Sequence, residues 1–244
     1  MIEYGVDRGV ARIALDSPHN RNALSSALMS ELERRLNDAG ADDTVRAVEL
    51  THTGGTFSAG ADLTEARVDM TEGTRRLVVL LQQIVQLPKP VVASIDGHVR
   101  AGGMGLLGAC DIALAGPAST FAFTEVRLGL APAIISLTTL PRLTARAAGR
   151  YYLTGETFDA STAARIGLVT EAVDDIDAAT HAMLDALRRA SPQGLRETKP
   201  LTTRALTFAD ADLLTTQSAR LFASDEAREG MTSFLEKRPP RWAL

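Results

Sequence analysis

Two glycine-bearing loops are the stretches whose residue types and spacing could do chemistry in this chain. Residues 58–62 (SAGAD) and residues 100–103 (RAGG) each follow a different predicted strand. Glycine lets a ligand approach the backbone closely, and the start of a helix leaves backbone N–H groups without intrahelical partners. If N–H groups from the two loops converge, they form a two-donor oxyanion hole, which suits a thioester carbonyl that becomes an enolate.

Glu125 lies just after a short predicted strand at residues 121–123, within the sequence FAFTEVRLGLAP. A buried carboxylate has a raised pKa and can accept and return a proton. A lone glutamate after a strand could instead be a surface residue or a helix cap.

The glycine-rich run at residues 102–108 has two competing interpretations. Residues 103–108 (GMGLLG) match G-x-G-x-x-G, the fingerprint of dinucleotide-binding loops. That fingerprint requires its first glycine directly after a strand, whereas residues 96–101 here separate the predicted strand from the glycines. In the other interpretation, the glycines only let a buried helix pack closely. We favour the oxyanion site over both.

The composition excludes several classes of protein. The chain has 244 residues, of which 45% are hydrophobic and 23% charged, and its net charge of −4 argues against a nucleic-acid surface. Its one cysteine, Cys110, lies in apolar company and is predicted to be a core residue. We expect a cytoplasmic protein, since the N-terminus has no signal pattern and three glutamines interrupt the longest apolar stretch, residues 77–87. The histidines show no metal-ligand spacing, so we expect no metal.

A recurring strand–strand–helix rhythm must position the two loops. Strands are predicted at residues 2–6, 10–15, 45–51, 91–95, 121–123 and 168–173, with a short one after Asp111. Helices are predicted after an N-cap at Ser25, with Leu28, Leu32 and Leu36 on one face, then over residues 77–87, 145–153 and 162–166, and from residue 175 onward. Asp62 is also predicted to cap a short helix. The rhythm indicates a layered α/β core followed by a helical C-terminal portion.

Four blocks of the sequence resemble the enoyl-CoA hydratase/isomerase (crotonase) superfamily. They are residues 55–63 (GTFSAGADL), 96–115 (DGHVRAGGMGLLGACDIALA), 119–132 (STFAFTEVRLGLAP) and 222–240 (FASDEAREGMTSFLEKRPP). The resemblance covers nearly the whole chain. It implies an α/β fold with a crotonase-like ββα spiral core that binds acyl-CoA over residues 1–190, and a C-terminal helical trimerisation region over residues 191–244. It also implies an acyl-CoA thioester substrate, with no separate cofactor because coenzyme A is part of that substrate, and a homotrimer or a hexamer built as a dimer of trimers.

The resemblance assigns roles to individual positions. It places the oxyanion-hole N–H groups on Ala61 and Gly102 and a catalytic carboxylate on Glu125. It assigns CoA contacts to Ala59, Asp62 and Leu63 along adenine and pantetheine, to His19, Asn20 and Arg21 on the other side of pantetheine, and to Phe234 and Lys237 toward a neighbouring subunit's CoA. His19, Arg21 and Lys237 could equally be solvated surface residues. Residues 131–143 (APAIISLTTLPRL) are implied to line the acyl pocket, and their apolar character fits a hydrocarbon tail.

The chain departs from the hydratases at one catalytic position. Their first catalytic glutamate falls on Gly105, which offers neither a proton nor an oxygen to hold water. General acid–base help contributes roughly 10²- to 10⁴-fold, so hydration by two glutamates should be impaired. The resemblance therefore implies either enoyl-CoA hydration, with His98 or Arg100 as candidates to compensate, or Δ3,Δ2-enoyl-CoA isomerisation with Glu125 as the single acid/base, in fatty-acid or related acyl-CoA metabolism. The alternative from another class is a non-catalytic CoA-ester-binding or assembly module.

Overall fold

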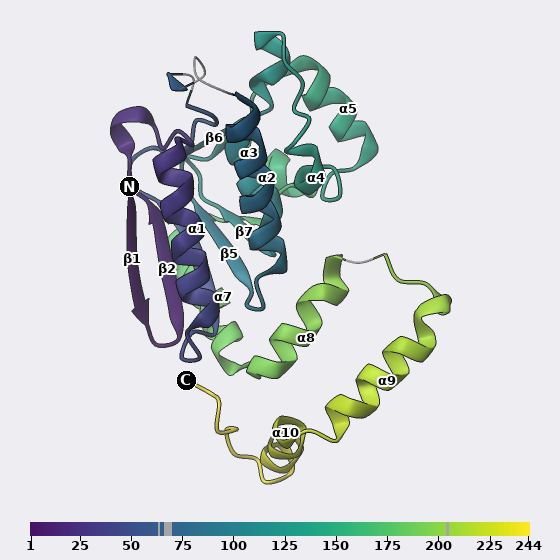
Figure 1. Cartoon of the computed structure of the whole chain (residues 1–244). Coiled ribbons are helices and arrows are strands. Elements are labelled where there is room, and N and C mark those ends of the chain that lie inside the picture. The colour runs from purple at the N-terminus through teal and green to yellow at the C-terminus, as the bar shows by residue number, and fades with distance from the viewer. Residues whose placement is uncertain (63, 66–69, 204) are drawn as a thin grey trace.

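The described strands of this chain form two sheets, and Figure 1 shows several of them with the helices that cover them. The computed structural model describes residues 1–62, 64–65, 70–203 and 205–244. Within those residues a six-stranded sheet has the order β1-β2-β3-β5-β7-β10, and a four-stranded sheet has the order β4-β6-β8-β9. The larger sheet consists of β1 Ile2–Asp7, β2 Val10–Leu15, β3 Ala47–His52, β5 Val91–Ile95, β7 Ile112–Ala115 and β10 Glu171–Ala172. The smaller sheet consists of β4 Thr56–Ser58, β6 His98–Arg100, β8 Thr120–Ala122 and β9 Phe158–Asp159.

The chain builds both sheets by repeating one unit. Each of the pairs β3–β4, β5–β6 and β7–β8 gives its first strand to the larger sheet and its second strand to the smaller one. Neighbouring strands from successive units run parallel in both sheets. Helix α2 (Met70–Gln86) follows the first of these pairs and helix α3 (Gly102–Ala109) follows the second. This arrangement confirms the α/β class and the predicted strand–strand–helix rhythm.

The N-terminal segment forms as its local sequence predicts. Strands β1 and β2 pair antiparallel around a turn in which Arg8 and Gly9 have positive φ angles of 41° and 75°. The side chain of Ser25 accepts a hydrogen bond from the N–H of Leu28 and caps helix α1 (Ser26–Ala41). The stripe of Leu28, Leu32 and Leu36 is buried, so this helix packs its apolar face on the core.

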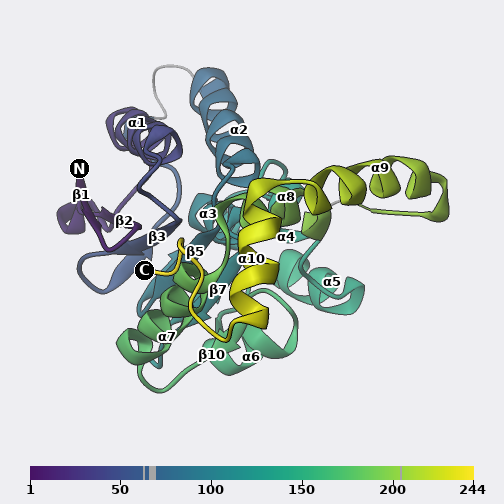
Figure 2. The same ribbon diagram turned by 90° about the horizontal axis from the view of Figure 1, so that it is seen from below.

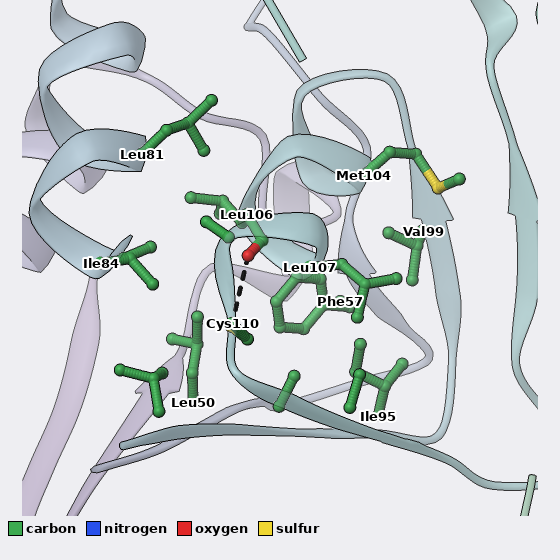
Figure 3. Close-up of a cluster of buried hydrophobic side chains, with 14 of the residues drawn as sticks. Leu50, Phe57, Leu81, Ile84, Ile95, Val99, Met104, Leu106, Leu107 and Cys110 are labelled. Atoms are coloured by element: carbon green, nitrogen blue, oxygen red, sulfur yellow. Dashed lines mark hydrogen bonds between the residues drawn. The ribbon is translucent and has the colours of Figure 1, made fainter. Parts of the chain in front are cut away.

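Helix α3 is the centre of the hydrophobic core. All of its residues are buried, as expected for a helix that is apolar on every side. Figure 3 shows its Leu106 and Leu107 among side chains from α2 and from the strands of both sheets. Cys110, at the end of α3, is buried there and its thiol hydrogen-bonds the carbonyl of Leu106 at 3.3 Å. Burial raises the pKa of this thiol to about 12, so the prediction that Cys110 is a core residue is confirmed.

The opposite face of the larger sheet carries helix α7 (Ile176–Arg189), which contacts strands β3, β5 and β7. Its Leu184 packs on Val92 and Leu114 from that face. The helices between the last unit of the spiral and α7 are short: α4 Ser136–Thr139, α5 Ala145–Thr154 and α6 Ala160–Arg165. No helix in the described residues is both long enough and apolar enough to span a bilayer.

The C-terminal portion is helical and extends away from the sheets (Figures 1 and 2). It comprises α8 Pro192–Thr203, α9 Ala211–Phe222 and α10 Asp225–Leu235. Lys199 anchors α8 to the core, because its buried ammonium lies 2.8 Å from a carboxylate oxygen of Asp111 and donates to the carbonyls of Ile84 and Lys89 at 2.9 and 3.0 Å.

Two features differ from the predicted elements. Strands β4, β6 and β9 lie in stretches for which the sequence predicts no strand. The strand predicted at residues 168–173 is wrong over most of its length, since only Glu171–Ala172 pairs with β7. The reason is local: after Gly167, with φ at 88°, the N–H groups of Leu168 and Val169 bond back to the carbonyl of Ala163 and close helix α6. The short helix predicted after Asp62 lies largely outside the described residues.

Candidate active site

The two glycine loops lie against each other at the start of helix α3. A Cβ added to Gly102 would lie 3.7 Å from the amide nitrogen of Ala61, and a Cβ added to Gly60 would lie 3.1 Å from the amide nitrogen of Gly102. Within the described part of the chain, neither the Ala61 nor the Gly102 N–H donates a hydrogen bond. The structure therefore brings together two backbone amides that are both available to an acceptor.

The topology of the smaller sheet explains why these loops meet. Strands β4, β6 and β8 are parallel neighbours, so their carboxyl ends share one edge of the sheet. Ala61 follows the end of β4, Gly102 follows the end of β6, and Glu125 follows the end of β8. Ligands of open parallel sheets bind outside this edge. All three residues that were predicted to carry the chemistry thus belong to the same edge.

Backbone strain precedes the Gly102 amide. Ala101 has φ at 45° and ψ at −119°, a conformation that L-residues rarely adopt. Because the ψ angle of Ala101 sets the plane of the next peptide, it also sets the direction of the Gly102 N–H. Gly60, with φ at 90°, holds the corresponding position before Ala61.

Asn22 joins the loop at residues 17–22 to the first glycine loop, and sequence analysis missed it. Its side chain is fully buried, donates to the carbonyls of Thr53 and Thr56 at 3.2 and 2.7 Å, and accepts from the N–H of Ser17 at 2.6 Å. Its own carbonyl accepts from the hydroxyl of Ser58 at 2.8 Å. The φ angle of 52° is one that asparagine tolerates better than most residues, which is the only local signal for this role.

The residues predicted to flank CoA fall on these two joined loops. The pKa of Asp62 is held below its ordinary value, chiefly by hydrogen bonds from Thr64 and further by the Asn20 side chain and the charge of His19. His19 and Asn20 therefore lie near Asp62. A buried oxygen of the Asn20 side chain has no hydrogen-bond partner among the described residues.

The remaining predicted CoA residues lie in different parts of the chain. The N–H of Ala59 donates to the carbonyl of Arg21 at 3.0 Å, so these two positions are neighbours. Leu63 lies outside the described residues. Phe234, which is 81% exposed, and Lys237 lie at and just beyond the end of α10, and their predicted role concerns another subunit.

Glu125 lies in a 3-10 helix, Thr124–Leu128, which starts directly after β8. The N–H groups of Gly129 and Leu130 bond to the carbonyl of Glu125 and fix its backbone. One of its carboxylate oxygens is buried and has no hydrogen-bond partner among the described residues. Burial raises the pKa of this carboxyl group, because little compensates the loss of water around the charged form. Such a carboxylate can accept and return a proton.

Gly105 is closely packed. A Cβ added there would lie 2.7 Å from Cγ2 of Ile135 and 3.4 Å from Cδ1 of Leu81. Added Cβ atoms on Gly103 and Gly108 would also approach their neighbours within 3 Å. The interpretation of close helix packing therefore accounts for these three glycines. It also leaves no room for a dinucleotide pyrophosphate at residues 103–108, so that alternative is wrong.

His98 and Arg100, the candidates to compensate for the missing glutamate, are both engaged by Thr120. Nδ1 of His98 lies 2.8 Å from the Thr120 hydroxyl, and Arg100 donates to the Thr120 carbonyl at 2.6 Å. Between them Val99 points into the core beside α3 (Figure 3). Because side chains alternate along a strand, His98 and Arg100 lie on the opposite face of β6. The described residues also hold no cluster of three or more His, Cys, Asp or Glu side chains that could bind a metal ion.

A cavity of about 560 Å³ opens beside Ala61. Leu24, Met29 and Leu77 give it apolar walls, and Glu65 and Glu72 are among its polar residues. This volume is in the range of small-molecule pockets. None of the described residues that line it comes from residues 131–143, which pack on helix α3 instead.

Known proteins match this chain over nearly its whole length. The family model described as enoyl-CoA hydratase/isomerase matches residues 5–243. A Rhodobacter capsulatus protein named probable enoyl-CoA hydratase is 33% identical over 260 residues, which cover 99% of this chain and 97% of that protein. The crystal structure of an enoyl-CoA hydratase from Mycobacterium avium is 56% identical with a TM-score of 0.79, covering 99% of this chain and 98% of that one. A crystal structure of an enoyl-CoA hydratase from Shewanella pealeana is 33% identical with a TM-score of 0.93, and the match covers 99% of this chain and 95% of that one.

Proposed function

Because the chain belongs to the enoyl-CoA hydratase/isomerase family and has the crotonase fold, we propose that it acts on an acyl-CoA thioester through an enolate bound by Ala61 and Gly102. One observation carries the proposal: two backbone amides that donate no hydrogen bond to any described residue lie against each other at the carboxyl edge of the smaller sheet. Two such donors aimed at one thioester oxygen stabilise the negative charge that develops there. Removing one donor of an oxyanion hole typically costs roughly 3 to 4 kcal/mol of transition-state stabilisation.

In the proposed mechanism Glu125 is the single acid/base. Its carboxylate removes a proton from C2 of a 3-enoyl thioester, and the electron pair moves onto the thioester oxygen to give a dienolate. The protonated carboxyl group then returns the proton at C4, so that the double bond lies between C2 and C3 and no atom is gained or lost. The raised pKa of Glu125 suits this task, because a base whose pKa lies closer to neutrality transfers protons in both directions efficiently.

We favour isomerisation over hydration because of the surroundings of Gly105. Hydration by two carboxylates needs a second oxygen to hold the attacking water. At Gly105 the side-chain atoms nearest to the missing Cβ are carbon atoms of Ile135 and Leu81, which cannot hold a water molecule. Enoyl-CoA hydration, which is the activity in the names of the relatives, is the second candidate, and fatty-acid or related acyl-CoA metabolism is the expected setting.

The test compares two substrates on the same purified protein. Binding of a saturated acyl-CoA is titrated by calorimetry, and turnover is then measured with 3-enoyl-CoA and with crotonyl-CoA. We expect faster isomerisation of the 3-enoyl thioester than hydration of crotonyl-CoA. Rapid hydration that is abolished in Glu125→Gln would contradict the single-base mechanism. Binding without turnover of either thioester would favour a non-catalytic CoA-ester-binding module.

We also propose that the chain assembles as a homotrimer or a dimer of trimers through its C-terminal helices. Large apolar side chains on and around α9 and α10 are exposed, among them Phe208 at 99%, Phe222 at 68% and Leu235 at 78%. An exposed apolar surface of this kind usually marks a protein interface. Phe234 and Lys237 would then approach the CoA of a neighbouring subunit. Analytical ultracentrifugation tests the assembly, and a monomer at micromolar concentration would contradict it.

A further inference from the structure

Helix α4 crosses helix α3 at two glycines that lie one turn apart. The carbonyl oxygen of Thr138 would lie 2.8 Å from a Cβ on Gly108, and Cγ2 of Ile135 would lie 2.7 Å from a Cβ on Gly105. The hydroxyl of Thr138 donates to the carbonyl of Gly105 at 2.9 Å, which ties the two helices together at this point. The position of α4, and with it the position of Ile135, is therefore fixed against Gly105.

The side chain of Ile135 fills the space next to Gly105 with hydrocarbon. It is 3% exposed, and its Cγ2 and Cβ lie 2.7 and 3.2 Å from the position of the missing Cβ. Cδ1 of Leu81 lies next, at 3.4 Å. A water molecule held inside a protein needs two to four polar partners. The carbonyl of Gly105 already accepts a hydrogen bond from the hydroxyl of Thr138 in α4.

We propose that Ile135 is a specificity-determining residue of this site: it keeps both a second carboxylate and an ordered water away from the carbon that water would attack. This inference rests on the proposed function, because it concerns what happens to the enolate formed there. With Ile135 in place the dienolate can be reprotonated at C4, but no water is held where it could add to C3 of the 2-enoyl thioester. A second consequence is that Gly105→Glu alone cannot produce a two-carboxylate hydratase, since its side chain and Ile135 compete for one space.

The experiment measures isomerisation of 3-enoyl-CoA and hydration of crotonyl-CoA in the same samples, so that partial unfolding cancels in their ratio. The variants are Gly105→Glu, Ile135→Ala and the double variant. We expect Gly105→Glu alone to lower Tm by about 5 °C or more through overpacking. We expect the double variant to recover part of that loss and to raise the hydration-to-isomerisation ratio about 100-fold, the scale of general acid–base help.

Smaller changes keep the test valid if Ile135→Ala folds poorly. Ile135→Leu removes the β-branch methyl Cγ2, the atom nearest to the missing Cβ of Gly105, at nearly constant side-chain volume. Ile13→Leu makes the same change at an equally buried isoleucine in β2. We expect the hydration-to-isomerisation ratio to rise several-fold in Ile135→Leu and to stay unchanged in Ile13→Leu.

Two results would overturn the inference. One is a ratio that stays at the wild-type value in both Ile135→Leu and the double variant while isomerisation persists. The other is a Gly105→Glu single variant with wild-type Tm and rapid hydration. Failure of the proposed function looks different, because the wild-type protein itself would then bind acyl-CoA and turn over no 3-enoyl thioester.

Discussion

Replacing Glu125 by glutamine should abolish activity without lowering stability. The carboxylate is the proposed proton carrier, so its loss should reduce kcat by roughly 10²- to 10⁴-fold, while KM changes little because the oxyanion-hole amides remain. In the wild-type protein kcat/KM should rise with pH as Glu125 ionises, since the base form removes the proton. The apparent pKa of this rise should lie above the ordinary value of about 4.3 for glutamate, because burial disfavours the charged form.

The effect of Glu125 on stability has the opposite sign. A carboxyl group whose pKa is raised by folding contributes stability that is fully present below its unfolded pKa and is lost as the pH rises through its folded pKa. Where this carboxyl group is ionised, the folded protein carries a partly buried charge, and one of its oxygens has no hydrogen-bond partner among the described residues. Glu125→Gln removes that charge and should leave the free energy of unfolding unchanged or raise it by about 1 kcal/mol or less, a gain limited by solvent screening. The difference should disappear as the pH is lowered toward 4, where the wild-type carboxyl is also neutral.

The matched control is Glu49→Gln. Glu49 is a second glutamate whose pKa is raised by burial, but it lies in β3 on the larger sheet and pairs with Arg12 at 3.8 Å. This variant should keep kcat within about twofold of the wild-type value. The assays are steady-state kinetics from pH 5 to 9 and urea unfolding at pH 7 and pH 4. The reasoning is refuted if Glu125→Gln retains most of its activity, or if it loses the same unfolding free energy at both pH values.

Three further predictions concern the elements that hold the site. Ala101→Gly should not lower the free energy of unfolding, because glycine relieves the strain at φ 45°, whereas Ala39→Gly in α1 should cost about 1 kcal/mol in urea unfolding. Lys199→Met should cost about 3 to 5 kcal/mol, because it leaves the buried carboxylate of Asp111 without its cation, and limited proteolysis should then cut within α8 first. Cys110 should resist alkylation at pH 8 until the protein unfolds, since its thiol is buried and its pKa is about 12; rapid labelling of the native protein would show an open core.

Elements with a long repeating pattern could be predicted from the sequence. The hairpin of β1 and β2, the Ser25 cap and the buried stripe of α1 follow from local signals of turn, cap and period. Strands β4, β6 and β9 have two or three residues each, which is too short for a period of two to be recognised. These short strands nonetheless bring the two loops together. That the two loops meet was therefore only a hypothesis on the sequence, and parallel pairing of β4 and β6 supplies the physical reason for their closeness.

Contacts between distant positions could not be predicted. Ile135 meets Gly105 across a separation of 30 positions, and nothing local in the sequence around Ile135 indicates which glycine it will cover. Asn22 is similar, since its partners Thr53 and Thr56 lie more than 30 positions away. Which side chain fills the space beside a glycine depends on how two helices pack against each other, and the local sequence does not contain that information.

The positions of the glycine run differ in what the structure allows at each of them. Gly102 is the first residue of α3, where a backbone N–H has no partner within the helix and stays available to a ligand. Gly105 and Gly108 lie within the helix, so there the absence of a side chain matters only for packing, and it lets α4 approach. In the proposed mechanism, binding of the thioester oxygen and choice of the second chemical group are thus carried by different turns of one helix. A change confined to Gly105 and Ile135 should therefore alter the reaction catalysed while leaving the oxyanion hole intact, because it touches none of the peptides that form the hole.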